Sequence, residues 1–286
     1  PSTRALAGPA PEVRSEGIYL VTRQLSETMV LTVSGHSHFS FAPWRGHSLV
    51  GPTESPYRGP VSQWRLTLAA IEQFLEQINA SSSAPVRLSL DDVGAAYGGL
   101  RPLTDQSGDD TYRASRASEL VDHGADGVHG IVSATGGKYT SSRAFAQKTV
   151  QHMGRRHRLT ARPSTSARTY LVGCGPTVES PDVLDRVYGT DAPSVRALAA
   201  QDARLARPAT ADGVPFAAVV HSARHESVAH LSDLLLRRTT VGTLGDPGDA
   251  VLTEAAELAG AELGWDAERI RTETDDARRA VRLPTT

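Results

Sequence analysis

Alternating hydrophobic and polar residues near the start of the chain predict short β-strands. Residues 18–21, 29–33 and 38–44 carry apolar side chains at every second position or in short β-branched runs, a pattern typical of strands half-buried in a sheet. The Arg45-Gly46 pair follows the third segment and precedes another apolar stretch, so it predicts a tight hairpin turn. This region therefore predicts an antiparallel meander.

Helical periodicity replaces this alternation further along the chain. Over residues 63–79 the apolar side chains recur at three- and four-residue spacing, which indicates an amphipathic helix. From Ser180 onward we expect only helices, each bounded by capping or turn residues. The stretch 155–178 is instead basic and then rich in proline, serine and glycine, which is typical of a linker.

Two glycine-rich segments come at the ends of predicted strands. The first closes a strand at Gly98-Gly99-Leu100-Arg101, and glycine inside a strand often marks the close approach of a ligand or another backbone. The second follows a strand predicted at 127–134 and turns through Gly136-Gly137 into a helix predicted at 138–153. Free N–H groups and the positive dipole end at such a helix start suit an electron-rich group. A simple strand–helix connection would need the same glycines.

Three cations accompany these glycines at intervals of 15 and 22 residues (116 − 101 and 138 − 116), namely Arg101, Arg116 and Lys138. A guanidinium binds phosphate or carboxylate through two parallel hydrogen bonds, and lysine adds a movable point charge. For a single cation, a solvated loop residue is the better interpretation. Together they suit a small phosphorylated substrate.

Composition narrows the choice of function. The formal net charge of −2 gives no general attraction to nucleic acid, and the short basic cluster at 155–158 reads as a solvated turn. The only cysteine, Cys174, excludes an internal disulfide and a cysteine-rich metal site. The chain contains no run of about 18 apolar residues, so its sequence predicts no membrane span. We therefore expect a chain that binds no nucleic acid and no metal, and whose first residues read as a linker entering mid-protein.

Several motifs together resemble the FAD-dependent glycerol-3-phosphate dehydrogenases, which have the D-amino-acid-oxidase-like flavoprotein fold. They are FAPWRG at 41–46, GPTESPY at 51–57, GLRPL at 99–103, GGKYTSSR at 136–143, RHE at 224–226 and GW at 264–265. The resemblance covers nearly all of the chain but only the latter half of a family member. No Gly-x-Gly-x-x-Gly sequence is present, so the nucleotide-binding half of the family is absent.

The resemblance implies an α+β fold. An antiparallel, β-rich substrate domain with an incomplete FAD domain is expected at 1–154, a linker at 155–178 and an all-α C-terminal domain at 179–286. The implied reaction is the oxidation of sn-glycerol 3-phosphate to dihydroxyacetone phosphate by hydride transfer to FAD. This reaction needs the missing nucleotide-binding half, so the chain alone is expected to be inactive. Two alternatives stay open: a glycerol-3-phosphate oxidase of the same fold, and a catalytically incomplete homologue or interaction module.

The resemblance also assigns the site residues. Arg101, Arg116 and Lys138 would bind the substrate, and Arg101 and Lys138 would also take part in catalysis. Tyr19 would contact the substrate from a strand position where the family often has histidine. The contacts to FAD would come from both glycine-rich segments, through Gly99, Leu100, Gly136, Gly137, Lys138, Tyr139 and Thr140.

Partners and location follow from the same resemblance. The implied partners are glycerol 3-phosphate and a quinone or another electron acceptor. The implied location is the cytoplasm; peripheral contact with the inner face of the cell membrane and a homo-oligomer are left open.

Overall fold

The computed structural model forms two compact units. The first contains residues 1–18, 52–66 and 98–170, and the second contains residues 19–51, 67–97 and 171–286. The structure describes residues 13–34, 37–81, 86–101, 118–136, 138–158, 162–175, 180 and 182–285. Each unit combines segments that are far apart in the sequence. The borders predicted at 154 and 178 stay a prediction.

The second unit contains the predicted antiparallel meander. Strands β1 (Arg14–Arg23), β2 (Val30–Ser34), β3 (Ser37–Trp44) and β4 (His47–Gly51) pair in the order β2-β3-β4-β1. Arg45 and Gly46 connect β3 to β4 with φ angles of 52° and 75°, the left-handed conformation that a two-residue hairpin needs. The predicted turn is therefore confirmed.

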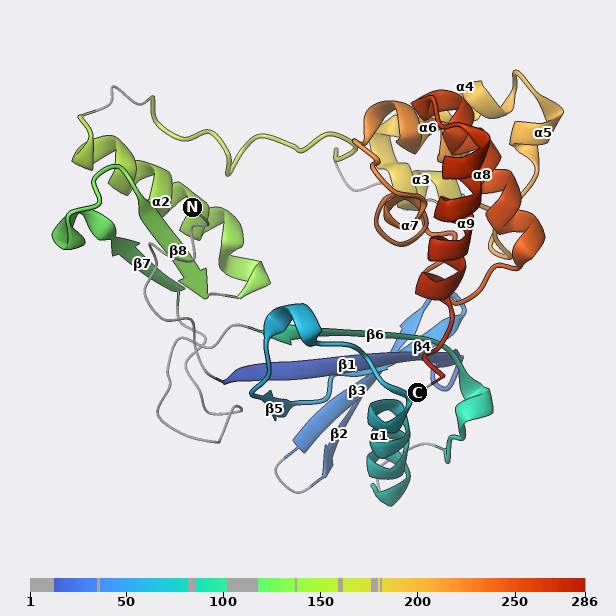
Figure 1. The fold of residues 1–286 in the computed structure, drawn as a ribbon, viewed down its shortest axis with the longest axis horizontal. Coiled ribbons are helices and arrows are strands. Elements are labelled where there is room, and N and C mark those ends of the chain that lie inside the picture. Colours follow the sequence, from blue (N-terminus) through green and yellow to red (C-terminus); the bar gives the residue numbers. More distant parts are fainter. Residues whose placement is uncertain are drawn as a thin grey trace. The chain divides into compact units, whose positions relative to one another are not determined.

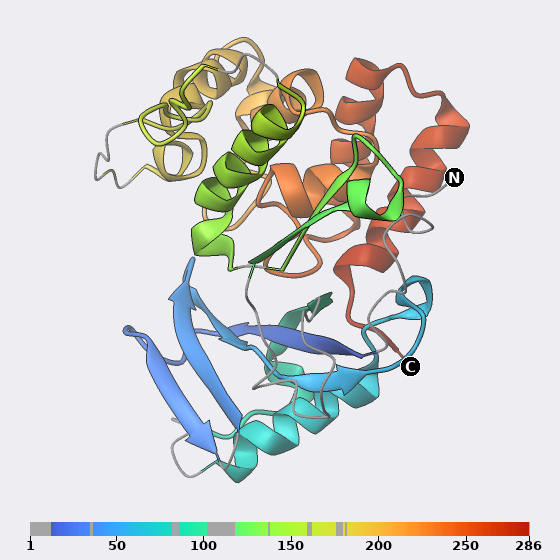
Figure 2. The same ribbon diagram turned by 90° about the vertical axis from the view of Figure 1, so that its left-hand side faces the viewer.

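Helix α1 (Leu68–Ala80) packs on one face of these strands, as Figure 2 shows. It begins at Leu68 rather than at the predicted residue 63, because the Thr67 hydroxyl accepts a hydrogen bond from Ala70 N–H and caps the helix. The Phe74 ring meets Phe39 of β3 edge-to-face at 5.6 Å between centroids, a favourable aromatic geometry. This contact fixes the buried face of the meander.

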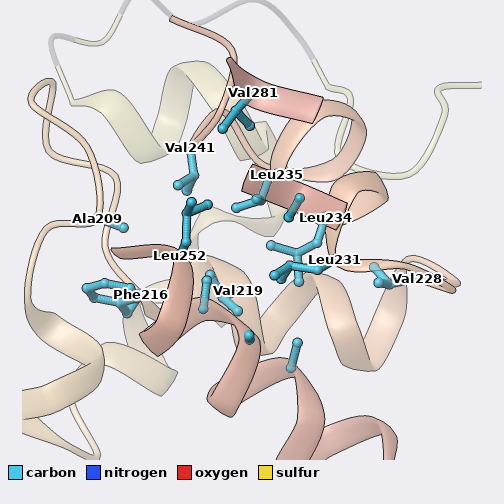
Figure 3. Packing of buried hydrophobic residues seen from close by; sticks show 14 residues of the cluster. Ala209, Phe216, Val219, Val228, Leu231, Leu234, Leu235, Val241, Leu252 and Val281 are labelled. Atoms are coloured by element: carbon cyan, nitrogen blue, oxygen red, sulfur yellow. The ribbon is translucent and has the colours of Figure 1, made fainter. Parts of the chain in front are cut away.

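Only helices follow in the C-terminal part of the second unit among its described residues, as predicted. They are α3 (Val183–Tyr188), η6 (Gly189–Asp191), α4 (Ala192–Ala199), α5 (Ala203–Ala206), α6 (Ala217–His225), α7 (Leu231–Asp233), η7 (Leu234–Arg238), α8 (Asp249–Leu263) and α9 (Ala267–Val281). Seven consecutive residues of α6, 217–223, are buried, so this helix is enclosed by its neighbours. Its Val219 belongs to the apolar cluster of Figure 3, which also contains Leu231, Leu234 and Leu252.

The first unit contains a second, smaller set of elements. Strand β5 (Ser55–Tyr57) pairs with residues 14–16 of β1. Strands β7 (Ser118–Asp122) and β8 (Val132–Gly136) form an antiparallel hairpin, with the short turn η4 (His123–Asp126) between them. A 3₁₀ turn, η5 (Tyr139–Ser141), then leads into α2 (Ser142–Arg156). Figure 1 shows α2 beside this hairpin.

The strand predicted at 127–134 begins late, at Val132. Gly127 and Gly130 have φ angles of 81° and 87°, a left-handed conformation that interrupts an extended strand. The prediction was wrong for this segment because these glycines serve a turn. Strand β6 (Val93–Arg101) matches the predicted glycine-rich strand, and the short turn η3 (Leu90–Asp92) precedes it.

Antiparallel pairing followed by helices agrees with the predicted α+β class. None of the helices in the described part of the chain is long and apolar enough to cross a bilayer.

Candidate functional site

Arg101 lies at the end of β6, and its guanidinium is held by groups of the first unit. Nη1 donates to Ser15 Oγ at 3.1 Å, and both terminal nitrogens lie 3.4 Å from the Thr53 carbonyl oxygen. The Glu54 carboxylate lies 4.0 Å from Nη1 and also accepts a hydrogen bond from Ser15 Oγ at 3.0 Å. With 31% of its side chain exposed, Arg101 is oriented by these partners and still reachable by a ligand.

The backbone around Arg101 explains this placement. Ser15 and Gly17 lie on the same face of β1 because side chains alternate along a strand. A Cβ atom on Gly17 would lie 2.1 Å from Arg101 Nη2, so the guanidinium lies directly against the glycine. Thr53 is tied to the same strand, since Ile18 N donates to Thr53 Oγ1 at 2.9 Å and Thr53 N donates to Ile18 O at 3.0 Å.

A second candidate position lies at the start of α2. Gly136 ends β8 with φ +71°, and Lys138 follows as an exposed residue. The Lys138 carbonyl accepts hydrogen bonds from the Ser141 N–H and hydroxyl at 3.0 and 2.9 Å, which forms the 3₁₀ turn. A cavity of about 430 Å³ lies here, lined among others by Gly136, Lys138, Tyr139 and Phe145.

Polar contacts of Asp122 fix α2 on the β7–β8 hairpin. Asp122 at the end of β7 accepts from Gly124 N–H at 2.9 Å, from Arg156 Nε at 3.1 Å and lies 3.4 Å from His152 Nε2. The Gly124 N–H, followed by His152 and Arg156, holds the pKa of Asp122 below its usual value. Asp122 is therefore charged at neutral pH and bridges strand and helix.

The structure groups the predicted residues unevenly. Gly136, Lys138 and Tyr139 line one cavity, while Thr140 lies in the same turn but not among its described lining residues. Gly99, Leu100 and Arg101 belong to β6. Tyr19 lies half-buried in the second unit. Arg116 and Gly137 lie outside the described residues.

Sequence reasoning missed the residues that orient Arg101. Ser15 and Gly17 share one face of a strand, but their spacing alone does not show which side chain lies against them. The 51–57 segment was noted only as a motif, yet its Thr53 and Glu54 contact Arg101. Among the described residues, no three His, Cys, Asp or Glu side chains are placed to bind a metal ion.

Two family models match successive parts of the chain. Residues 2–143 match the FAD dependent oxidoreductase model, and residues 130–270 match the C-terminal domain of alpha-glycerophosphate oxidase. The two matches meet in the segment that contains β8 and the start of α2.

Named relatives point to the same group. "Glycerol-3-phosphate dehydrogenase 2" of Mycobacterium tuberculosis is 28% identical, over 91% of this chain and 47% of the relative. The mitochondrial glycerol-3-phosphate dehydrogenase of Bos taurus is also 28% identical, over 84% of this chain and 35% of the relative. The chain thus spans about half, or less, of the curated relatives it matches.

A solved structure shares the fold. The glycerol-3-phosphate dehydrogenase from Bacillus halodurans, complexed with FAD, aligns with a TM-score of 0.71 and 21% identity. The alignment covers 94% of this chain and 57% of that one. The predicted flavoprotein fold is therefore confirmed.

Proposed function

Because the chain belongs to the D-amino-acid-oxidase-like family of FAD-dependent glycerol-3-phosphate dehydrogenases, we propose that it forms the substrate-binding and helical portion of such an enzyme. The proposed reaction converts sn-glycerol 3-phosphate to dihydroxyacetone phosphate. Its strongest structural support is the cavity at the start of α2, where Lys138 and the Gly136 turn lie together. An exposed ammonium beside a glycine turn suits a phosphorylated substrate next to a planar ring.

The residues present fit one edge of a flavin. Gly136 adopts φ +71° at the end of β8, a conformation open to glycine, and no side chain caps the 3₁₀ turn that follows. The first N–H groups of that turn are therefore left for an electron-rich ring edge. Phe145 adds an apolar wall to the same cavity. When bound, the flavin supplies the acceptor for the hydride that leaves C2 of the substrate.

Arg101 and Lys138 take different roles in this proposal. Lys138 carries a mobile positive charge and would bind the phosphate dianion. Arg101 is oriented by Ser15 and Thr53 and would stabilise negative charge that develops on the C2 oxygen. A guanidinium is a hydrogen-bond donor only, so Arg101 would stabilise this oxygen rather than accept its proton.

We further propose that activity requires a nucleotide-binding half supplied with this chain. The relatives are about twice as long as the matched region, and no dinucleotide-binding glycine sequence is present in the chain. We also propose ligand contacts by Arg116, Tyr19 and the backbone of residues 99–100. A quinone or another electron acceptor and a peripheral membrane contact are part of the same proposal.

The test is anaerobic bleaching of the flavin by glycerol 3-phosphate, with the chain alone and together with the N-terminal half of a full-length relative. We expect bleaching only in the combined sample. Lys138→Ala should raise the KM for glycerol 3-phosphate about tenfold or more, because a charge-assisted hydrogen bond contributes about 1.5–3 kcal/mol. Lys148→Ala, on the same helix but outside the cavity lining, should leave KM unchanged.

An unchanged KM in Lys138→Ala would remove this lysine from the site. Absence of bleaching in a combined sample that binds FAD would favour a catalytically incomplete homologue instead.

An oxidase of the same fold is the second candidate. The match of residues 130–270 to the C-terminal domain of alpha-glycerophosphate oxidase favours it specifically. Stoichiometric hydrogen peroxide in air, formed at the rate of substrate oxidation, would identify the oxidase. A rate that depends on an added quinone would identify the dehydrogenase.

A further inference from the structure

A long part of the first unit contains cations without any carboxylate. Between Asp126 and Glu179 the sequence has no aspartate or glutamate. The same stretch has eight basic residues, namely Lys138, Arg143, Lys148, Arg155, Arg156, Arg158, Arg162 and Arg168. Its formal charge is thus 8 − 0 = +8, whereas the whole chain carries −2. Such local charge attracts anions even though the protein as a whole does not.

Four of these arginines line one cleft between α2 and the segment that begins at Arg162. The cleft has a volume of about 800 Å³, and its arginines are Arg143, Arg155, Arg158 and Arg162. Ala146, Val150 and Gly154 of α2 form an apolar part of the lining. The volume lies within the range of about 300–1,000 Å³ that is common for small-molecule sites. We refer to it as the arginine cleft.

The walls of the arginine cleft are joined by defined contacts. Arg143 Nη1 donates to Gln147 Oε1 at 2.8 Å and to Ser166 Oγ at 2.9 Å, which links α2 to the opposite segment. Arg158, two residues after the end of α2, adopts φ +52°, so the chain turns there. The cleft is therefore built by contacts within one compact unit.

No carboxylate of the described residues balances the charge of the arginine cleft. In the described part of the chain, no carboxylate lies within 4.0 Å of these four guanidinium groups. The neighbouring Arg156 shows the contrast, because it pairs with Asp122 at 3.1 Å. Four like charges around one cavity repel each other unless an anion binds among them.

We propose that the arginine cleft binds a small organic anion that carries two phosphate groups. Guanidinium groups bind phosphate oxygens through paired hydrogen bonds, and cations from both walls can reach a ligand with two such groups. Ser164 and Ser166 add hydroxyl groups to the lining. The apolar surface of Ala146, Val150 and Gly154 would contact the carbon part of the ligand.

The arginine cleft adjoins the proposed substrate position, because Ala146 and Val150 line both cavities, but its charged residues are different. Gly136, Lys138 and Tyr139 are not among its described lining residues. Glycerol 3-phosphate carries a single phosphate and would use fewer of the four cations. The inference therefore does not depend on the proposed enzymatic activity.

Isothermal titration calorimetry on the purified chain without flavin tests the proposal. The ligands are a hexose bisphosphate, ADP, inorganic pyrophosphate and glycerol 3-phosphate, each at about 0.1 M salt so that exposed charges are screened. We expect saturable 1:1 binding of at least one organic ligand with a Kd on the order of 10 µM. Glycerol 3-phosphate and pyrophosphate should bind at least tenfold more weakly.

Absence of saturable binding of both organic ligands would overturn the proposal. If pyrophosphate bound as tightly as the organic ligands, the apolar lining would contribute nothing to affinity. That result would overturn the proposal that the ligand is an organic molecule. Tighter binding of a polyglutamate peptide would identify an acidic polypeptide as the occupant and also overturn it.

Variants distinguish binding in the arginine cleft from general electrostatic attraction to the basic stretch. The double variant Arg155→Ala, Arg158→Ala should weaken binding about 100-fold, from roughly tenfold for each charge-assisted contact. Val150→Glu places a carboxylate on the lining, and because Val150 is 63% exposed, the helix should tolerate it while binding is lost.

Lys148→Ala and Arg168→Ala are the matched controls. Both remove one positive charge from the same basic stretch but lie outside the cleft lining. Each should change Kd by less than about threefold, since screened charges interact weakly. Equal weakening in controls and cleft variants would show diffuse attraction and refute a defined site. Circular dichroism should show unchanged helix content for every variant.

Discussion

Helices α2 and α8 have the same length but opposite environments. Each contains 15 residues. Helix α8 buries Leu252, Ala255, Ala256, Ala259 and Gly260, whereas α2 buries only Gly154 among its described residues. Helix α8 is therefore stabilised by apolar packing, and α2 by polar contacts such as the one between Arg156 and Asp122.

This difference indicates which part of the chain has surface available for ligands. In the second unit, Leu252 packs into the cluster shown in Figure 3 and leaves little apolar surface on that face of α8. In the first unit, Val150 of α2 stays 63% exposed next to four guanidinium groups that pair with no carboxylate among the described residues. Both proposed ligand positions, at the start of α2 and along it, lie in the less densely packed region, as expected for binding elements.

Truncating one apolar side chain on each helix should give the largest contrast. Leu252→Ala removes a fully buried side chain from the core cluster and should lower the free energy of unfolding by about 2–5 kcal/mol. Val150→Ala removes an exposed side chain and should change it by less than about 0.5 kcal/mol. Urea denaturation followed by circular dichroism measures both. Equal losses would show that α2 is packed as tightly as α8.

A pair of arginine–aspartate contacts gives the next contrast. Arg45 in the β3–β4 turn donates to both Asp212 carboxylate oxygens at 2.8 Å, to Thr240 O at 3.1 Å and to Thr243 Oγ1 at 2.6 Å. Burial raises the pKa of Asp212, but hydrogen bonds from Thr210 and Arg45 outweigh this and hold the pKa below its usual value. The Arg45 contact therefore involves a charged, partly buried carboxylate.

Removal of each arginine tests this second contrast. Arg45→Ala leaves Asp212 without its cation at a site only 23% exposed and should cost about 1–3 kcal/mol of unfolding free energy. Arg156→Ala breaks the contact with Asp122, where the arginine side chain is 52% exposed, and should cost less than about 1 kcal/mol. Thermal unfolding monitored by calorimetry distinguishes them. A larger loss of unfolding free energy in Arg156→Ala than in Arg45→Ala would contradict the proposal that the Arg45 contact stabilises the chain more.

Arg45 also shows what the sequence could and could not predict. The turn at Arg45-Gly46 followed from its position between two strand patterns, and the φ angles confirm it. The partner, Asp212, is 167 residues away, and neither spacing nor periodicity links the two. Local patterns predict elements and turns because their causes are local, whereas a long-range ion pair depends on the packed structure.

The candidate site likewise has features that the sequence predicted and contacts that it did not. The glycine turn at Gly136 and the helix after it followed from a local strand–turn–helix pattern, and the structure shows a cavity there. The contacts of Arg101 with Ser15 and Thr53 depend on which strands become neighbours, so sequence spacing did not predict them. The late start of β8 came from glycines whose positive φ angles a strand pattern does not reveal.

The smallest expected contrast is in the pH dependence of stability. His221 of α6 is 5% exposed, and its ring meets Tyr188 edge-to-face at 5.6 Å between centroids and lies tilted against the His225 ring at 5.0 Å. Burial, followed by the charge of His225, lowers the pKa of His221 below its ordinary 6.5, although Glu226 and Asp191 partly oppose this. His157, which comes just after the last residue of α2, is instead exposed on the surface.

The sign follows from proton linkage. The unfolded chain takes up the His221 proton near pH 6.5, while the folded chain takes it up only at lower pH, so the unfolded state binds more protons in between. The contribution of His221 to the free energy of unfolding should therefore be fully present above about pH 7. The free energy of unfolding should fall as the pH drops below 6.5. His221→Phe keeps the aromatic contact and should reduce this fall between pH 7 and 5.5, whereas His157→Gln should leave the wild-type slope. Urea denaturation at half-unit pH steps measures the slopes. Equal slopes in His221→Phe and the wild type would show that the buried imidazole is not linked to the stability of the helical core.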